Sequence, residues 1–139
     1  WLTFIEEGCT LLLNNHGLVE KITADGLNNI ITSGTCKGQS ALYCMTKWTP
    51  GFHLLQSNRN LVAKITAQGL NNVADACSTG RSALFNLVDN PIGCAILRAN
   101  PGLVAKITQE ELNRTITQGP NKNYSVFDIR LLNLLLYLY

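Results

Sequence analysis

The stretch LVEKITADGLNN at residues 18–29 recurs as LVAKITAQGLNN at 61–72 and again as LVAKITQEELNR at 103–114. The leucine that opens each stretch sets a period of 43 residues and then 42. The one-residue difference falls in the loop between Asn71 and Ser82, and loops absorb such changes at little cost. A fixed period of this length is typical of repeat arrays, in which one unit cannot bury its apolar face alone and stacked units can.

Two further phrases recur with the same period. One reads Gly-x-x-Leu-Leu-x-x-Asn, with Ile for the first Leu in the third copy, and it begins at Gly8, Gly51 and Gly93. The other appears as GQSALYCM at 38–45, as GRSALFNL at 80–87 and, in a damaged copy, as NYSVFDIR at 123–130. We therefore divide the single repeat domain 1–139 into a partial repeat 1–17, two repeats at 18–60 and 61–102, and a partial or degenerate repeat 103–139.

Residues suited to helix N-termini recur in every period and predict about four short helices per repeat. The expected N-caps are Asn15, Asn58 and Asn100, then Thr23, Thr66 and Thr108, then Ser40, Ser82 and Ser125, while Thr49-Pro50 and Asn90-Pro91 open the remaining helix. No segment alternates β-branched with polar residues. The predicted fold is all-α, an α-solenoid.

The apolar positions indicate where these helices run. In the third copy Pro101 suits a first helical position, and a short helix is expected through 103–107. The helix that begins after Thr23 should present one apolar face, formed by Leu27, Ile30 and Ile31. Two glycines, Gly34 and Gly119, suit the end of that helix.

Composition restricts the function classes. Charged residues are 14% of the chain, against about 25% in ordinary domains, and the net charge of +2 comes from scattered residues. This pattern lacks the basic stripe that a nucleic-acid backbone requires. The five cysteines have no CxxC spacing, and we interpret them as reduced core residues of a protein in a reducing compartment, the cytoplasm.

The two ends of the chain suggest a fragment of a longer protein. The chain begins at Trp1 and its one methionine is Met45, so we expect the natural start to lie elsewhere. The apolar tail 129–139 is about half the length that a membrane-spanning helix needs. We expect no membrane span, and predict that the tail is a closing helix, that the parent chain continues, or that this end docks on another chain.

Two repeated polar positions allow a functional and a structural interpretation. Asn28, Asn71 and Asn113 could bind a peptide ligand, but we favour a ladder in which each amide satisfies backbone groups of its own or the adjacent unit. Lys21, Lys64 and Lys106 could attract an acidic partner, although a solvated helix face with stems on apolar surface is the simpler interpretation. The aromatic residues Tyr43, Phe52 and Phe85 lie beside leucines and are expected in the core.

No catalytic motif is present in the sequence. The two histidines, His16 and His53, occupy different repeat positions without the spacing of a metal site. Cys44 or Cys94 could pair with a histidine as a nucleophile, but nothing marks either thiol as activated. We therefore expect no enzyme activity, no cofactor and no small-molecule substrate.

The phrase G-x-S-A-L at 38–42 and 80–84 resembles the G-x-T-P-L that opens the first helix of an ankyrin repeat. With the L-L-x-x-N and K-I-T-x-x-x-L-N phrases, it is similar to the enlarged ankyrin-like repeats of effector proteins from intracellular bacterial pathogens. The resemblance extends to about Phe127. The chain departs from ankyrin in its longer period, in having SALY or SALF for TPLH, and in lacking a finger-like hairpin signal. The resemblance implies binding to a partner protein, commonly a host protein after delivery into a host cell, and no catalytic residue.

Three functions stay open from the sequence. The first is a protein–protein interaction module, the second a structural spacer in a multidomain protein, and the third a nucleic-acid-binding helical repeat. The phrases GRSAL and NNHG superficially resemble the DNA-reading repeats of plant-pathogen effectors, but those have a shorter period and a basic stripe. Non-repeated residues distinguish the first two functions, because a binding face should gather Trp48, Arg59, Arg81 and Arg98, whereas a spacer should leave them scattered.

Overall fold

A computed structural model describes residues 2–73 and 80–129, and this part of the chain is all-α. The helices are η1 (Leu2–Phe4), α1 (Glu6–Leu13), α2 (His16–Val19), α3 (Ala24–Asn28), α4 (Ala41–Met45), α5 (Thr49–Ser57), α6 (Arg59–Ala63), α7 (Ala67–Asn71), α8 (Ala83–Val88), α9 (Pro91–Ala99), α10 (Pro101–Val104) and α11 (Gln109–Asn113). Residues 126–129 are again helical. Within these ranges no β-strand forms, and only isolated backbone bridges join the loops.

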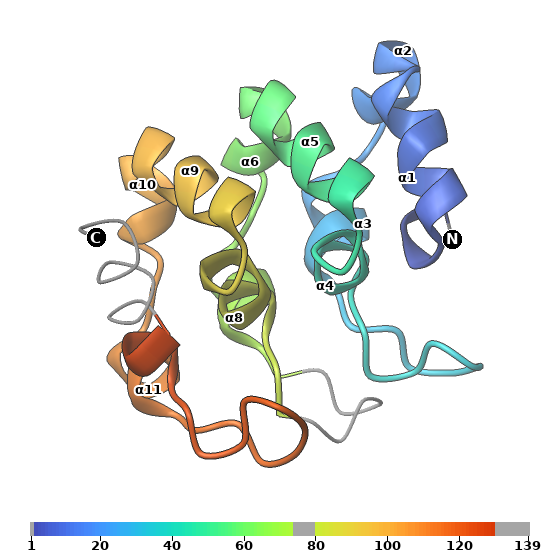
Figure 1. The fold of residues 1–139 in the computed structure, drawn as a ribbon. Coiled ribbons are helices and arrows are strands. Elements are labelled where there is room, and N and C mark those ends of the chain that lie inside the picture. Colours follow the sequence, from blue (N-terminus) through green and yellow to red (C-terminus); the bar gives the residue numbers. More distant parts are fainter. Residues whose placement is uncertain (1, 74–79, 130–139) are drawn as a thin grey trace.

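The helices repeat in one order, a short helix, a long helix and two short ones, as the capping pattern predicts. Corresponding helices of successive copies contact each other: α1 packs on α5, α5 on α9, α3 on α7 and α4 on α8. Figure 1 shows the long helices α1, α5 and α9 side by side in one layer, with α4, α8 and α11 below them. The sequence boundaries at 18–60 and 61–102 fall inside α2 and α6, so a division before α4 and α8 follows the helices more closely.

The predicted Thr and Ser caps are confirmed. The hydroxyl oxygens of Thr23, Thr66 and Thr108 accept a hydrogen bond from the backbone N–H three residues later, at 3.0, 3.0 and 3.2 Å. Those of Ser40, Ser82 and Ser125 do the same at 3.0, 3.1 and 3.1 Å. Each bond satisfies one backbone donor that a helix start leaves without an intrahelical partner.

The predicted Asn caps are correct in position and wrong in mechanism. Asn15, Asn58 and Asn100 stand before α2, α6 and α10, but their side chains make no N-cap bond. Instead each amide Nδ2 donates to the carbonyl four residues earlier, at 2.7, 2.8 and 2.7 Å, and so completes the C-terminus of the preceding long helix. These residues join two consecutive helices, and their side chains serve the first one.

Three helix limits differ from the sequence expectation. In the third copy the short helix is Pro101–Val104, so most of 103–107 lies beyond it. Helix α3 ends at Asn28, which leaves Ile30 and Ile31 half-buried in the following loop. Gly34 and Gly119 do not end helices: both have positive φ, 84° and 91°, and their carbonyls accept the N–H of a residue three further on in a loop turn.

The glycine at the third position of each long helix allows a close crossing with the preceding short helix. A Cβ added at Gly8, Gly51 or Gly93 would stand 1.8, 1.9 or 2.0 Å from the carbonyl oxygen of Leu2, Met45 or Leu87. No side chain fits at such distances, and only glycine lets the two backbones approach so closely. The recurring glycine is therefore a packing requirement of every copy.

The loop before each capping serine also repeats its conformation. The residue two before that serine has positive φ in all three copies: 84° at Gly38, 74° at Gly80 and 71° at Asn123. Asn is the kind of non-glycine residue that tolerates this region, which explains how the damaged NYS copy keeps the same turn. In the first copy Ile31 donates to the Gln39 carbonyl and accepts from the Gly38 N–H, a small backbone pairing that the sequence did not signal.

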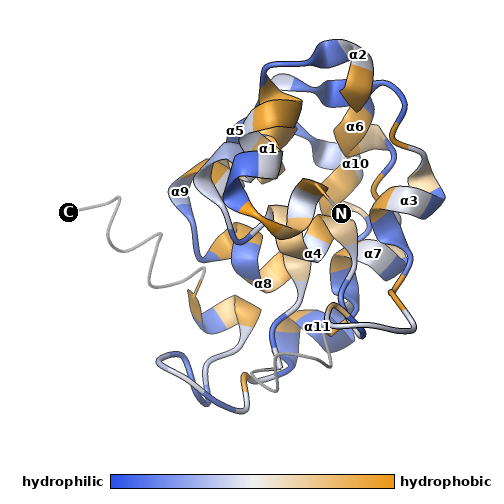
Figure 2. Cartoon of the chain, turned by 90° about the vertical axis from the view of Figure 1, so that its right-hand side faces the viewer, coloured by the Kyte–Doolittle hydropathy of each residue, from blue (hydrophilic) through white to orange (hydrophobic). Residues whose placement is uncertain are grey.

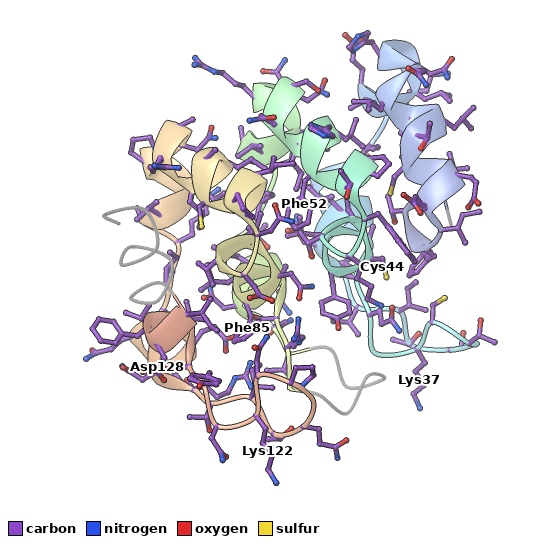
Figure 3. All side chains as sticks on the ribbon, viewed as in Figure 1. Lys37, Cys44, Phe52, Phe85, Lys122 and Asp128 are labelled. Atoms are coloured by element: carbon purple, nitrogen blue, oxygen red, sulfur yellow. The ribbon has the colours of Figure 1, made fainter. Side chains whose placement is uncertain are left out.

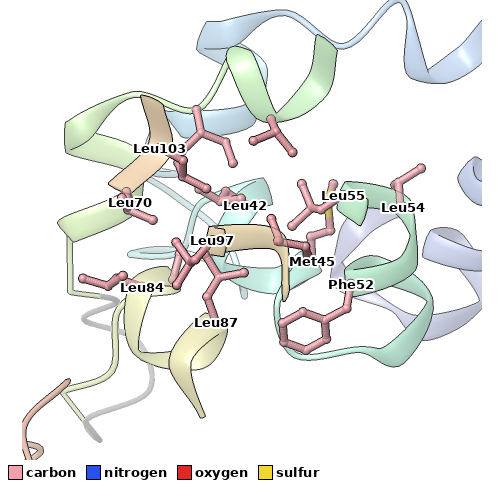
Figure 4. Packing of buried hydrophobic residues seen from close by; sticks show 14 of the residues in the cluster. Leu42, Met45, Phe52, Leu54, Leu55, Leu70, Leu84, Leu87, Leu97 and Leu103 are labelled. Atoms are coloured by element: carbon pink, nitrogen blue, oxygen red, sulfur yellow. The ribbon is translucent and has the colours of Figure 1, made fainter. Parts of the chain in front are cut away.

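One apolar core runs through the copies. Phe52 and Phe85 belong to it, as predicted, with leucines from every long helix. Figure 4 shows part of this core, including Phe52, Leu54 and Leu97. Tyr43 is also buried, in a small separate cluster with Cys44. Figure 2 looks toward the N-terminal end, where apolar segments of α1 and α2 are visible.

Candidate interaction surface

The repeated asparagines hold successive copies together. The Asn28 amide Nδ2 donates to the carbonyls of Ala24, at 2.7 Å, and of Lys64, at 2.8 Å, while its Oδ1 accepts the Thr66 N–H at 3.0 Å. Asn71 makes the corresponding bonds to Ala67, Lys106 and Thr108. The favoured interpretation of these positions as a structural ladder is confirmed for Asn28 and Asn71.

The repeated lysines make a second link between copies, which neither sequence interpretation included. Lys64 Nζ donates to the carbonyls of Ile22, at 2.6 Å, and Glu20, at 3.5 Å, in the preceding copy. Lys106 Nζ donates to the Ile65 carbonyl. Lys21 belongs to the first copy and is exposed. Two of the three lysine charges therefore lie on backbone carbonyls of a neighbouring copy.

The non-repeated residues proposed from sequence are scattered over the surface. Trp48 is half-buried against the core, and its buried indole Nε1 has no partner within the described part of the chain. Arg59 and Arg98 are exposed, and Arg59 shares a groove of about 340 Å³ between α6 and α10 with Lys106. Arg81 lies in a different groove, between α4 and α8.

This second groove, the α4–α8 groove, has a volume of about 290 Å³ and is lined by Lys47, Arg81, Asn86 and Asp89, among others. Two cations lie over aromatic rings beside it: Lys47 Nζ is 4.6 Å from the centre of the Tyr43 ring, and Arg81 Cζ is 5.0 Å from that of Phe85. Such stacking holds a cationic side chain in place while its charge stays available.

Hydrogen bonds fix the walls of the α4–α8 groove. Asn86 Nδ2 on α8 donates to Thr46 Oγ1, 3.1 Å away at the end of α4. Lys47 Nζ donates to Gln39 Oε1 at 3.0 Å. Arg81 Nη1 lies 3.5 Å from Asp89 Oδ2. The groove therefore presents two cations and one carboxylate, and hydrogen bonds and an ion pair hold the side chains that line it.

The Asp89 side chain is 36% exposed, and partial burial raises the pKa of its carboxyl above the ordinary value. The Arg81 charge and hydrogen bonds from Asn121 and Arg81 act against this increase. The Asn121 Nδ2 atom lies 3.4 Å from Asp89 Oδ2, so the loop of the third copy also reaches the edge of the groove.

The groove residues do not repeat from copy to copy. Alignment of the copies on their capping serines places Gln39, Arg81 and Tyr124 at one position, and Lys47 and Asp89 at another. This variation is the signal by which sequence reasoning could have found Lys47, Asn86 and Asp89, which it missed.

The chain matches no protein-family model, no curated protein and no solved structure.

None of the histidines and cysteines among the described residues lines the α4–α8 groove. His16 and His53 are exposed on α2 and α5. Burial, reinforced by the charge of Glu6, raises the pKa of the Cys9 thiol to about 11. Cys44 Sγ donates to Gln39 Oε1 at 2.8 Å. Residues 2–73 and 80–129 contain no group of three or more His, Cys, Asp or Glu side chains placed to hold a metal ion.

Two sequence expectations concern residues outside these ranges. Cys77 and all but the first residue of the apolar tail 129–139 are not among the described residues. In the part that is described, every helix is too short or too polar to cross a bilayer.

Proposed function

We propose that this chain is a protein–protein interaction module, a solenoid of ankyrin-like repeats that binds a partner protein through the α4–α8 groove. One observation carries the proposal. The polar residues that repeat are used inside the stack, whereas polar and charged residues that do not repeat line the groove between two copies. Repeat proteins commonly bind along a surface formed by successive units, and variable positions there give specificity.

The chemistry of the groove favours an acidic segment of the partner. Lys47 and Arg81 line the same groove, and Asp89 neutralises only part of their charge. A carboxylate side chain entering between them would accept hydrogen bonds from both cations. The volume of about 290 Å³ suits one or two side chains of a loop or extended segment rather than a folded domain.

The spacer function also has an observation in its favour, because Trp48, Arg59, Arg81 and Arg98 do not gather on one surface. The groove residues decide between the two functions, and they can be tested directly. The test compares capture from a eukaryotic lysate by the full chain, by the double variant Lys47→Glu/Arg81→Glu, and by Lys37→Glu/Lys122→Glu. The last is a control with the same charge change on exposed loop lysines (Figure 3).

An interaction module predicts one captured protein that withstands moderate salt, is lost in the groove variant and is kept in the loop control. Equal loss in both variants, together with steep salt sensitivity, would instead favour the nucleic-acid alternative. Capture of nothing by the wild type would favour the spacer. Circular dichroism and thermal unfolding of all three proteins establish that the variants are folded.

A further inference from the structure

Asn86 stands at a position that is not an amide in the other two copies. The residue four after the capping serine is Cys44 in the first copy, Asn86 in the second and Ile129 in the third. All three are buried, with exposed fractions of 1%, 8% and 5%. A side-chain amide at such a position costs stability unless its polar atoms have partners. Packing alone would favour an apolar residue here, as in the third copy.

Only part of the Asn86 amide has a partner within the described residues. Its Nδ2 donates one hydrogen to Thr46 Oγ1, 3.1 Å away at the end of α4. That hydroxyl donates its own proton to the Tyr43 carbonyl at 2.7 Å, so it can only accept from Asn86, and the amide must turn Nδ2 rather than Oδ1 toward it. The second Nδ2 hydrogen and the Oδ1 atom make no hydrogen bond within residues 2–73 and 80–129.

The remaining polar atoms of this amide open into the α4–α8 groove, which Asn86 lines. In the described part of the chain, the buried side-chain atoms that lack a partner are Thr3 Oγ1 and Trp48 Nε1, so Asn86 Oδ1 is not enclosed by the protein. The bond to Thr46 fixes the orientation of the amide. A ligand in the groove therefore meets one hydrogen-bond acceptor and one donor that the fold already holds in place.

On the basis of the binding function proposed for the α4–α8 groove, we infer that Asn86 binds the main chain of an extended segment of the partner protein. Its Oδ1 accepts a main-chain N–H and its Nδ2 donates to a main-chain carbonyl. A side-chain amide carries the same donor and acceptor as a peptide unit, so the two are complementary. An acidic side chain of the same segment lies between Lys47 and Arg81 and sets the register.

The contact with Asn86 selects the conformation of the segment. In a helix, the main-chain N–H and C=O groups are used in intrahelical hydrogen bonds except at the two ends, so the body of a helix offers nothing to a side-chain amide. An extended segment has these groups available. A partner that carried its acidic residues on a helix would bind the two cations alone, and Asn86 would contribute nothing to its affinity.

The test uses short peptides and the full chain. Pentapeptides with a central Glu and random residues at the other positions are captured on the immobilised wild type, and those that Lys47→Glu/Arg81→Glu also captures are discarded. The tightest remaining peptide is titrated into the protein, and NMR chemical shifts give its dissociation constant. Asn86→Cys, the residue type of the first copy, should bind this peptide about tenfold more weakly, the effect of losing two hydrogen bonds.

Ester substitution in the peptide tests the same contact without changing the protein. Replacing each internal peptide bond in turn by an ester removes one main-chain N–H and leaves the shape of the peptide nearly unchanged. One of these esters should weaken binding to the wild type about fivefold. The same ester should have no further effect on Asn86→Cys, because the acceptor of that N–H is already gone. The side-chain amide signals of Asn86 should shift when the parent peptide binds.

Asn113→Cys is the matched control, because Asn113 is exposed on α11 and its amide bonds within its own helix. It should bind the peptide like the wild type, and circular dichroism shows whether Asn86→Cys keeps the fold. If it does not, the ester series and the Asn86 signals of the wild type decide alone.

Two outcomes overturn the inference, and they differ in what they say of the groove. Binding that requires Lys47 and Arg81 but is equal in Asn86→Cys and with every ester overturns the main-chain contact and leaves the proposed function of the groove standing. If no peptide distinguishes the wild type from Lys47→Glu/Arg81→Glu, the proposed function fails as well.

Discussion

At the scale of single residues, Gly51 makes one of the closest approaches between two helices, because a Cβ there would meet the Met45 carbonyl at 1.9 Å. We predict that Gly51→Ala lowers the free energy of unfolding by about 3 kcal/mol, since the backbones must separate to admit the methyl group. Gly17→Ala is the matched control, because Gly17 lies in α2 with nothing within 4 Å of its Cβ position.

The control substitution should be neutral or should stabilise the protein by up to about 1 kcal/mol, the difference in helix propensity between the two residues. Both free energies come from urea unfolding. Equal destabilisation by the two substitutions would contradict the assigned role of Gly51.

Asp128 gives a prediction on pH dependence. Its Oδ2 accepts the Ser125 backbone N–H and hydroxyl, both at 2.8 Å, and these bonds lower the pKa of the carboxyl below its ordinary value. A carboxyl whose pKa is lower in the folded than in the unfolded state stabilises the fold at pH values above its ordinary pKa. This contribution is lost as the pH falls through the lowered, folded-state pKa. The stability difference between wild type and Asp128→Asn should therefore shrink toward acid.

NMR titration of the Asp128 carboxyl measures the same effect directly. Ser125→Ala removes the hydroxyl bond but keeps the backbone bond, which is the larger cause. The substitution should move the pKa only part of the way back to its ordinary value. A complete return would mean that the hydroxyl is the main partner.

Residue chemistry allowed the Ser and Thr caps to be predicted, because these side chains have one local role before a helix. The Asn residues at 15, 58 and 100 were assigned the wrong partner for a physical reason. Each stands between two helices, and an amide can accept from the second or donate to the first. The sequence pattern is the same whichever of these two hydrogen bonds the amide makes.

At the scale of the helices, the Asn contacts should contribute unequally to stability. Asn28 is buried and bonds to Lys64 and Thr66 of the next copy. We predict that Asn28→Ala costs about 2 kcal/mol, because the Lys64 carbonyl and the Thr66 N–H lose a partner that water does not fully replace. Asn113→Ala should cost only about 0.5 kcal/mol, because its bond lies within one helix. Urea unfolding compares them, and a larger loss at Asn113 would refute this account.

The order of helices could be inferred from sequence, but the contacts between them could not. The lysine spacing shows that Lys21, Lys64 and Lys106 are equivalent. That Lys64 reaches a carbonyl 42 residues earlier depends on how closely the copies stack. Helix α3 also ended earlier than its apolar pattern suggested, because Ile30 and Ile31 are half-buried in the loop that leads to the next copy.

At the scale of the whole molecule, equivalent residues should differ in importance with their place in the stack. Leu54 lies between neighbouring copies and is fully buried, whereas Leu11 at the same position of the first copy is 46% exposed. We predict that Leu54→Ala costs about 3 kcal/mol, and Leu11→Ala less than about 1 kcal/mol. The free energies of unfolding, measured by urea denaturation, test this difference. Equal costs would mean that the copies do not pack as described.

The period in the sequence was sufficient to identify which positions are equivalent, and therefore which of them vary. It was not sufficient to locate the α4–α8 groove. Lys47 follows α4 and Arg81 precedes α8, and they share a groove only because α4 and α8 pack side by side. The offset between copies is a property of packing, and no single stretch of sequence contains it.

The Asn and Lys contacts between copies involve backbone carbonyls and N–H groups, which no substitution of a neighbouring side chain removes. They set the distance and the rotation from one copy to the next, independently of which side chains the surface carries. If the α4–α8 groove binds a partner as we propose, changes at Lys47, Arg81 or Asp89 would alter which ligand it binds while leaving the spacing between copies unchanged. A ligand that spans two copies would thus be selected by length as well as by chemistry.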